Sequence, residues 1–138
     1  MKRQRLCFLL LFCLLVVGCS ANGQQQLSRV DVQMVNLEGS EAEIVTITDK
    51  TKLGDIKLLL KRVNWEPNSE VSMERREDAK ITLYLQLEQD MPEQLFEYRV
   101  WFNEDDTITI ISNNLKEGYG YLDQKNTEIF KREFLKVN

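Results

Sequence analysis

The chain has 138 residues, of which 18 are Lys or Arg and 22 are Asp or Glu, so its formal net charge at neutral pH is −4. It contains no histidine, which excludes Ser-His-Asp and Cys-His catalysis and histidine-ligated metal sites. The acidic balance also argues against direct binding to nucleic acid, because that binding depends on clustered Lys and Arg.

The N-terminal segment has the pattern of a signal peptide. Three basic residues lie among the first five positions, an apolar run extends from Leu6 to Val17, and small Gly18 precedes Cys19. A charged start, an apolar middle and a small residue at the cleavage site are typical of secretory signals. A helix of about twelve residues is only about 18 Å long, against about 30 Å of membrane hydrocarbon. A transmembrane helix is therefore the weaker interpretation.

The tetrapeptide Val16-Val17-Gly18-Cys19 resembles the lipobox of bacterial lipoproteins. The resemblance implies that residues 1–18 are removed as a signal peptide and that Cys19 becomes the diacylated first residue. Because two acyl chains are enough for stable anchoring, we expect the domain to be tethered to the cell membrane on its outer, extracytoplasmic side. The alternative is an ordinary secretory signal that ends by chance in a cysteine.

Processing at Cys19 would leave the mature chain without a free thiol. Cys7 and Cys13 would leave with the signal peptide, and the sulfur of Cys19 would carry lipid, so disulfides, thiolate catalysis and cysteine zinc sites are excluded. The mature chain would keep 15 of the 18 basic residues and all 22 acidic ones, for a formal charge of about −7. Gly118-Tyr119-Gly120 is too short for a dinucleotide-binding turn, and we expect no cofactor.

The part after Cys19 divides into a linker and one domain. Residues 19–28 are small and polar, which predicts a lipidated N-terminus followed by a flexible linker. Residues 29–138 have the usual length of a single domain. Apolar and polar residues alternate over 30–35 and again over 43–48, so the domain is expected to open with two strands.

A helix should follow these strands. Asp49 or Thr51 is suited to cap its start, and Pro67 prevents its continuation much beyond Trp65. Its apolar residues recur at helical spacing and require a sheet to cover them; they are Leu53, Ile56, Leu59, Leu60 and Val63. The basic pair Lys61-Arg62 beside this stripe is predicted to be solvated surface.

Three further strands are predicted over 81–88, 96–103 and around 108–110, each with one apolar and one mainly polar face. A short strand at 119–122 and a last helix capped by Asn126 or Thr127 would complete the domain. One-sided alternation is typical of antiparallel sheets with one solvated face. The sequence therefore predicts an α+β fold, in which an antiparallel sheet of about five strands carries two helices packed on one face.

The order of these elements, the lipobox and the strand from Phe96 to Phe102, which reads F-E-Y-R-V-W-F, together resemble small YhfM-like lipoproteins of Gram-positive bacteria. The resemblance extends over most of the mature chain. It implies neither an activity nor any site residues.

The acidic run Glu104-Asp105-Asp106 falls in the connection between two predicted strands. Adjacent carboxylates can hold a hard cation, which would allow a cation-dependent hydrolase. The run lacks the alternating ligands, central Gly and distal Glu of an EF-hand loop. Asp is also favoured in turns for local hydrogen bonds, so the main prediction is a hairpin turn, with Glu104, Asp105 and Asp106 as weak metal candidates.

Tyr84 and Trp101 are predicted to lie on the sheet face opposite the helices. Grouped exposed aromatic residues can mark an interface, so these two residues are the candidate site for a protein or envelope partner. The alternative is that Trp101 is half-buried by its neighbours or by the N-terminal strands. The sequence thus favours a noncatalytic binding domain of a membrane-anchored lipoprotein over a cation-dependent hydrolase or a purely structural envelope lipoprotein.

Overall fold

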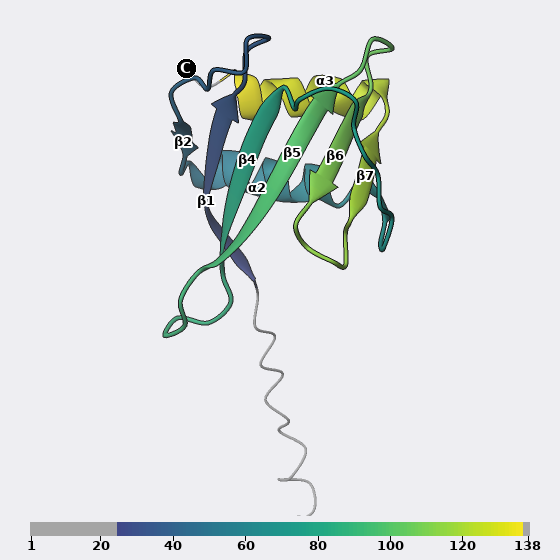
Figure 1. The fold of residues 1–138 in the computed structure, drawn as a ribbon. Coiled ribbons are helices and arrows are strands. Elements are labelled where there is room, and N and C mark those ends of the chain that lie inside the picture. The colour runs from purple at the N-terminus through teal and green to yellow at the C-terminus, as the bar shows by residue number, and fades with distance from the viewer. Residues whose placement is uncertain (1–24, 137–138) are drawn as a thin grey trace, which may run out of the picture.

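The computed structural model describes residues 25–136, so the predicted signal peptide and lipobox lie outside the described residues. Seven strands form one sheet in the order β2-β1-β4-β5-β6-β7-β3, and every neighbouring pair is antiparallel. Within the described residues two α-helices accompany the sheet, and the second continues as a short π-helix (Figure 1). The elements are β1 (Gln26–Met34), β2 (Val45–Ile47), α2 (Lys50–Leu60), β3 (Asn64–Glu66), β4 (Ala79–Gln86), β5 (Gln94–Phe102), β6 (Ile108–Ser112), β7 (Tyr119–Leu122), α3 (Gln124–Phe130) and η2 (Lys131–Leu135).

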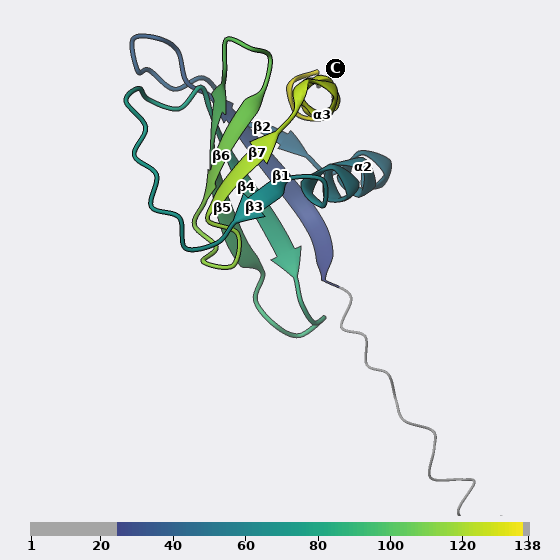
Figure 2. The same ribbon diagram turned by 90° about the vertical axis from the view of Figure 1, so that its right-hand side faces the viewer.

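The predicted α+β class is confirmed, because α2 and α3 pack on the same face of the antiparallel sheet (Figure 2). The sheet has seven strands rather than about five. The unpredicted strand is β3, whose three residues pair with β7 at the far edge. Three residues are too few to show an alternating pattern, so sequence periodicity could not identify this strand.

Helix α2 forms as its sequence predicts. Asp49 is its N-cap, and its carboxylate accepts a hydrogen bond of 2.9 Å from the backbone N–H of Lys52. This bond satisfies one of the backbone donors left free at a helix start. The side chains at helical spacing, Leu53, Ile56 and Leu59, are buried against the sheet.

The C-terminal helix starts earlier than predicted. Asp123, rather than Asn126 or Thr127, is the N-cap of α3, and its carboxylate accepts from the backbone N–H of Asn126. Thr127 is instead buried inside the helix. The rings of Phe130 and Phe134 stack with centroids 4.4 Å apart, and both are buried, so aromatic packing anchors the C-terminal helix on the sheet.

The core lies between the sheet and the two helices. Alternate residues of β4, β5 and β6 point to the helices and are buried, as the apolar alternation predicts. The contributors from these strands are Ala79, Ile81, Leu83, Tyr98, Val100, Ile108 and Ile110.

The outer face of the sheet is partly covered by residues 67–78, the crossing segment, which runs between β3 and β4 over β6 and β5 (Figures 1 and 2). Beneath it Trp101 is 0% exposed, and its indole N–H donates to the carbonyl oxygen of Arg75 at 3.0 Å. Glu77 of the same segment is buried and accepts from the guanidinium of Arg99 at 3.1 Å. Burial raises the pKa of Glu77, but backbone and Arg99 hydrogen bonds outweigh burial and leave this pKa lowered.

The prediction that Trp101 is exposed is therefore wrong. The alternative prediction was that Trp101 is half-buried by its neighbours or by the N-terminal strands. The crossing segment instead buries the side chain completely. Tyr84 is half-buried on the same face, with the guanidinium of Arg29 3.7 Å from the centre of its ring. The two residues do not form one exposed aromatic patch.

The start of the domain also differs from the predicted boundary. Strand β1 begins at Gln26 and pairs with Gln86 of β4, so it includes three residues of the predicted linker 19–28. Over residues 25–136, no helix is both long and apolar enough to cross a membrane.

Candidate functional site

The acidic run at 104–106 forms the turn between β5 and β6. The backbone N–H of Asn103 donates to the carbonyl oxygen of Thr107 at 3.0 Å, which closes the turn. The carboxylate of Asp105 accepts from the hydroxyl and the backbone N–H of Thr107, and the hydroxyl lowers the pKa of this carboxyl group. In the part of the chain that the structure describes, no group of three His, Cys, Asp or Glu side chains could hold a metal ion. The two bonds to Thr107 account for Asp105 as a turn-forming residue.

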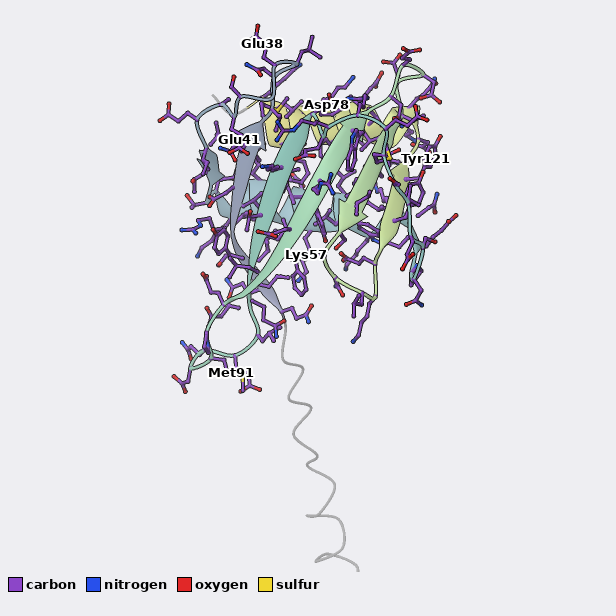
Figure 3. The ribbon with its side chains drawn as sticks, in the orientation of Figure 1. Glu38, Glu41, Lys57, Asp78, Met91 and Tyr121 are labelled. Atoms are coloured by element: carbon purple, nitrogen blue, oxygen red, sulfur yellow. The ribbon has the colours of Figure 1, made fainter. Side chains whose placement is uncertain are left out.

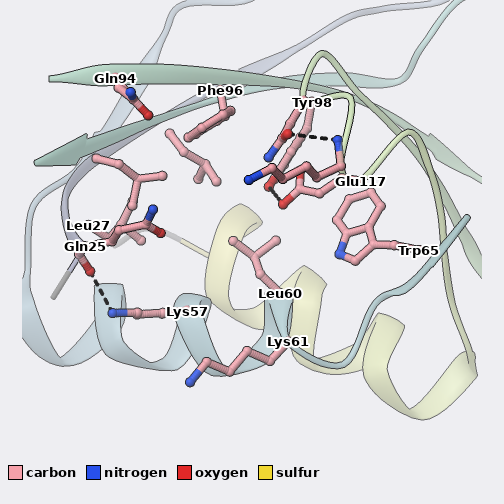
Figure 4. A pocket seen from close by; sticks show the side chains of 14 residues that line it. Gln25, Leu27, Lys57, Leu60, Lys61, Trp65, Gln94, Phe96, Tyr98 and Glu117 are labelled. Carbon is pink, nitrogen blue, oxygen red and sulfur yellow. Dashed lines mark hydrogen bonds between the residues drawn. The ribbon is translucent and has the colours of Figure 1, made fainter. Parts of the chain in front are cut away.

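A cavity of about 620 Å³ lies between α2 and one end of the sheet (Figure 4). Its volume falls in the range of small-molecule sites in proteins, about 300–1,000 Å³. Apolar side chains from β1, α2, β3, β4 and β5 form most of its walls; they are Leu27, Leu60, Trp65, Leu83, Leu85 and Phe96.

The cavity follows from the way the helices lie on the sheet. Both helices run across the strands rather than along them (Figure 1). Each helix is about 10–12 Å wide, whereas the nine residues of β5 extend over about 30 Å. Two helices side by side therefore leave one end of the sheet uncovered. Leu85 and Phe96 lie there and are only half-buried, although they continue the apolar face.

Glu117 is the acidic group among the described residues that line the cavity. The hydroxyl of Tyr98 donates to its Oε1 at 3.1 Å, and the hydroxyl of Ser112 donates to its Oε2 at 2.7 Å. Burial, followed by the charge of Glu117, raises the pKa of Tyr98. Because Tyr98 keeps its proton, it remains a donor, and the two bonds fix the carboxylate at the cavity wall; Figure 4 shows the bond from Tyr98.

Three lysines stand at the rim of the cavity: Lys57 in α2, Lys61 as the C-cap residue of α2, and Lys116 on the loop between β6 and β7. The Nζ of Lys57 donates to the carbonyl oxygen of Gln25 at 2.8 Å. Lys61 and Lys116 are exposed, and within the described residues none of the three lysines makes a salt bridge. An apolar cavity with a cationic rim suits a ligand that has an apolar part and an anionic part.

The sequence did not reveal this cavity. Lys61 was predicted to be solvated surface, and it is, but its position beside an apolar hollow depends on how α2 lies on the sheet. The predicted candidates lie elsewhere: the acidic turn follows the opposite end of β5, and Tyr84 and Trp101 lie on the outer face. Leu60 was predicted to belong to the buried helix stripe, but the structure leaves it half-buried at the cavity wall.

No protein-family model and no curated protein matches this chain. A similar solved structure is that of a thioesterase-like protein from Clostridium sporogenes ATCC 15579. The two chains are 22% identical, the match covers 83% of this chain and 98% of the other, and the TM-score is 0.52. At this level of identity the similarity shows a shared fold.

This finding overturns the prediction that the domain is not an enzyme, because a thioesterase-like protein adopts the same fold. That prediction came from eliminating catalysis that uses histidine or cysteine. The lack of histidine and of a free cysteine does not exclude catalysis by a carboxylate fixed in an apolar cavity. Such a carboxylate can act as a general base without either residue.

Proposed function

We propose that this protein is a membrane-anchored lipoprotein whose domain binds an amphiphile, with an acyl-type chain and an anionic head group, in the cavity between α2 and the sheet. The observation that carries the proposal is the combination of apolar walls with three rim lysines. The acyl chain of the ligand would lie against Leu85 and Phe96. Its anionic head group would pair with Lys57, Lys61 or Lys116. The anchor at Cys19 is proposed on the lipobox resemblance alone.

The apolar walls must supply most of the affinity. Burying about eight methylene groups gains about 6 kcal/mol at about 0.8 kcal/mol each, which is comparable with the cost of association. Ion pairs at exposed positions contribute about 1 kcal/mol or less. The lysines would therefore set the orientation of the ligand, with its head group at the rim and its chain inside.

The two tryptophans allow a direct test of binding. Trp65 lines the cavity, whereas Trp101 is buried on the other face of the sheet. A fatty acid brominated in the middle of its chain should quench Trp65 saturably, because heavy-atom quenching requires contact with the indole. The measurement is tryptophan emission during titration of the acid into the full chain.

Two variants serve as matched controls for this titration. Trp101→Phe leaves Trp65 as the emitting residue and should keep the quenching, whereas Trp65→Phe leaves Trp101 and should lose it. Equal quenching of both variants would show nonspecific adsorption and would contradict binding in the cavity.

A second candidate function is hydrolysis of an acyl ester or thioester, and Glu117 is the observation that favours it. Its carboxylate lies in the cavity wall, held by Tyr98 and Ser112, and the structural neighbour is thioesterase-like. Glu117 would take a proton from water, the hydroxide would attack the acyl carbonyl carbon, and the leaving thiol or alcohol would recover the proton. This assignment replaces the acidic turn as the candidate hydrolytic group.

Glu117→Gln should abolish such hydrolysis without removing binding. Loss of a general base usually costs about 10²–10⁴-fold in rate, while the amide keeps the size of the side chain and the apolar walls are unchanged. The measurement is thiol release from a long-chain acyl thioester, run beside the Trp65 titration. Glu104→Gln in the turn is the matched control and should retain full activity. Equal rates for Glu117→Gln and the parent chain would exclude Glu117 as the base.

A further inference from the structure

The end of the domain that carries the cavity also exposes large apolar side chains: Met91 and Leu115 on its loops, and Leu95 near the start of β5, paired with Tyr84 on the outer face. Met91 and Leu95 are each 51% exposed, and Leu115 is 85% exposed. Met91 lies at the tip of the connection between β4 and β5 (Figure 3), and Leu115 lies in the loop between β6 and β7. The β6–β7 loop borders the cavity, because Asn114 and Lys116 contribute to its lining, and the β4–β5 connection ends beside it at Gln94, the first residue of β5.

The chain enters the domain at this same end. Gln25 lines the cavity, and β1 starts at the next residue. Gln25 lies six positions after Cys19 in the sequence, and a chain of six residues spans at most about 20 Å when fully extended. A lipid anchor on Cys19 would therefore hold the cavity end, rather than the opposite end, within about 20 Å of the bilayer.

We propose that this end of the domain docks on the lipid bilayer, with the side chains of Met91 and Leu115 in the interfacial layer and the cavity open toward the lipid. The inference rests on the proposed function and deepens it, because it makes the ligand a membrane amphiphile that passes between bilayer and cavity without crossing bulk water. The partner is the bilayer itself.

The arrangement of the apolar side chains favours a bilayer over a folded protein partner. Met91 and Leu115 stand on two separate connections, β4–β5 and β6–β7, at the same end of the sheet (Figure 1), whereas a protein interface usually has one well-packed apolar centre. Interfacial insertion needs only apolar side chains that can reach the boundary between head groups and acyl chains. The tether would hold these loops at the high local concentration that an intramolecular contact provides.

Charge contributes little to this docking. The connection between β4 and β5 carries Glu88, Asp90 and Glu93, while Lys57, Lys61 and Lys116 stand at the cavity rim. With Glu117 of the cavity wall included, four acidic and three basic groups leave a formal charge of only −1 on these residues. We therefore expect docking to depend weakly on ionic strength, in contrast to the binding of a basic surface to anionic lipid.

Environment-sensitive fluorescent labels on single introduced cysteines test the docking. Leu115→Cys places the label on the proposed lipid face. Leu37→Cys is the matched control, because Leu37 is also fully exposed but lies in the turn at 36–40, with Glu38, at the opposite end of the domain (Figure 3). Both positions are on exposed turns, so neither change should affect folding. The full chain is purified from membranes and reconstituted in phosphatidylcholine vesicles.

The emission of the label at 115 should shift to shorter wavelengths. Lipids that carry a nitroxide on the acyl chain should quench this label several-fold more than they quench the label at 37. The parent chain should take up no label if Cys19 is acylated and Cys7 and Cys13 have been removed. Equal, water-like emission at 115 and 37 would overturn the docking.

The Trp65 titration separates failure of the docking from failure of the binding function. Water-like emission at 115 together with quenching of Trp65 by the brominated acid would refute docking and leave ligand binding intact. Lipid quenching at 115 without quenching of Trp65 would support docking and refute the cavity as a lipid site.

Discussion

Trp101→Ala should lower the free energy of unfolding by about 3–5 kcal/mol, the usual cost of removing a fully buried tryptophan. The Trp101 side chain is 0% exposed and lies under the crossing segment, where its indole N–H also donates to the carbonyl of Arg75. Domains are stable by only about 5–15 kcal/mol, so the variant would keep a small part of its stability. The measurement is urea unfolding followed by circular dichroism.

Tyr84→Ala is the matched control for this change. Tyr84 lies on the same face but is half-buried, and Arg29 covers its ring. Its loss should cost clearly less than the loss of Trp101. Trp101→Phe should be intermediate, because the phenyl ring fills part of the site but cannot donate to Arg75. Similar small losses for both alanine variants would show that the crossing segment does not bury Trp101 in solution.

Gly120→Ala should destabilise the domain by about 1–3 kcal/mol, as overpacking does, and should also weaken ligand binding. Gly120 of β7 is paired with Trp65 of β3. A methyl group on Gly120 would lie 2.5 Å from a carbon of the Trp65 ring and 2.7 Å from a methyl of Val63. The ring covers the glycine, a known way to compensate for a glycine in a strand.

Because Trp65 is a wall of the cavity and packs on Tyr98 with ring centres 5.7 Å apart, its displacement would change the binding site. The Trp65 titration with brominated fatty acid should therefore show at least a several-fold weaker response in Gly120→Ala. Gly54→Ala is the matched control. No atom lies within 4 Å of a methyl group there, and replacing glycine in a helix should stabilise the domain by about 0.5–1 kcal/mol. Equal effects of the two substitutions would contradict the close contact between Trp65 and Gly120.

The apolar walls of the cavity, the Glu117 carboxylate and the loop that carries Leu115 can each be tested by a separate measurement. The apolar walls determine whether Trp65 is quenched, Glu117 determines whether an ester or thioester is cleaved, and Leu115 reports contact with lipid. Binding, hydrolysis and docking can therefore fail one at a time.

Local sequence determined the elements of this protein. The Asp49 cap and the helical spacing of Leu53, Ile56 and Leu59 predicted α2, and two-residue alternation predicted β4 and β5, because both signals depend on neighbours within a few residues. Those elements were sufficient to predict the α+β class and the placement of both helices on one face. The short strand β3 and the start of α3 at Asp123 were not predicted, since three residues show no period and several residues near 123 are suitable caps.

The candidate site required the tertiary structure. The alternating pattern of β5 is the same whether or not the crossing segment covers Trp101. Its burial depends on long-range contacts, such as the hydrogen bond from Trp101 to Arg75, 26 positions away. The cavity arises because helices about 10 Å wide cross strands about 30 Å long, which brings Leu27, Leu60, Phe96 and Glu117 together from four parts of the chain. Sequence periodicity reports which face of an element is apolar, but the partner of that face, or the lack of one, is decided only when distant segments pack.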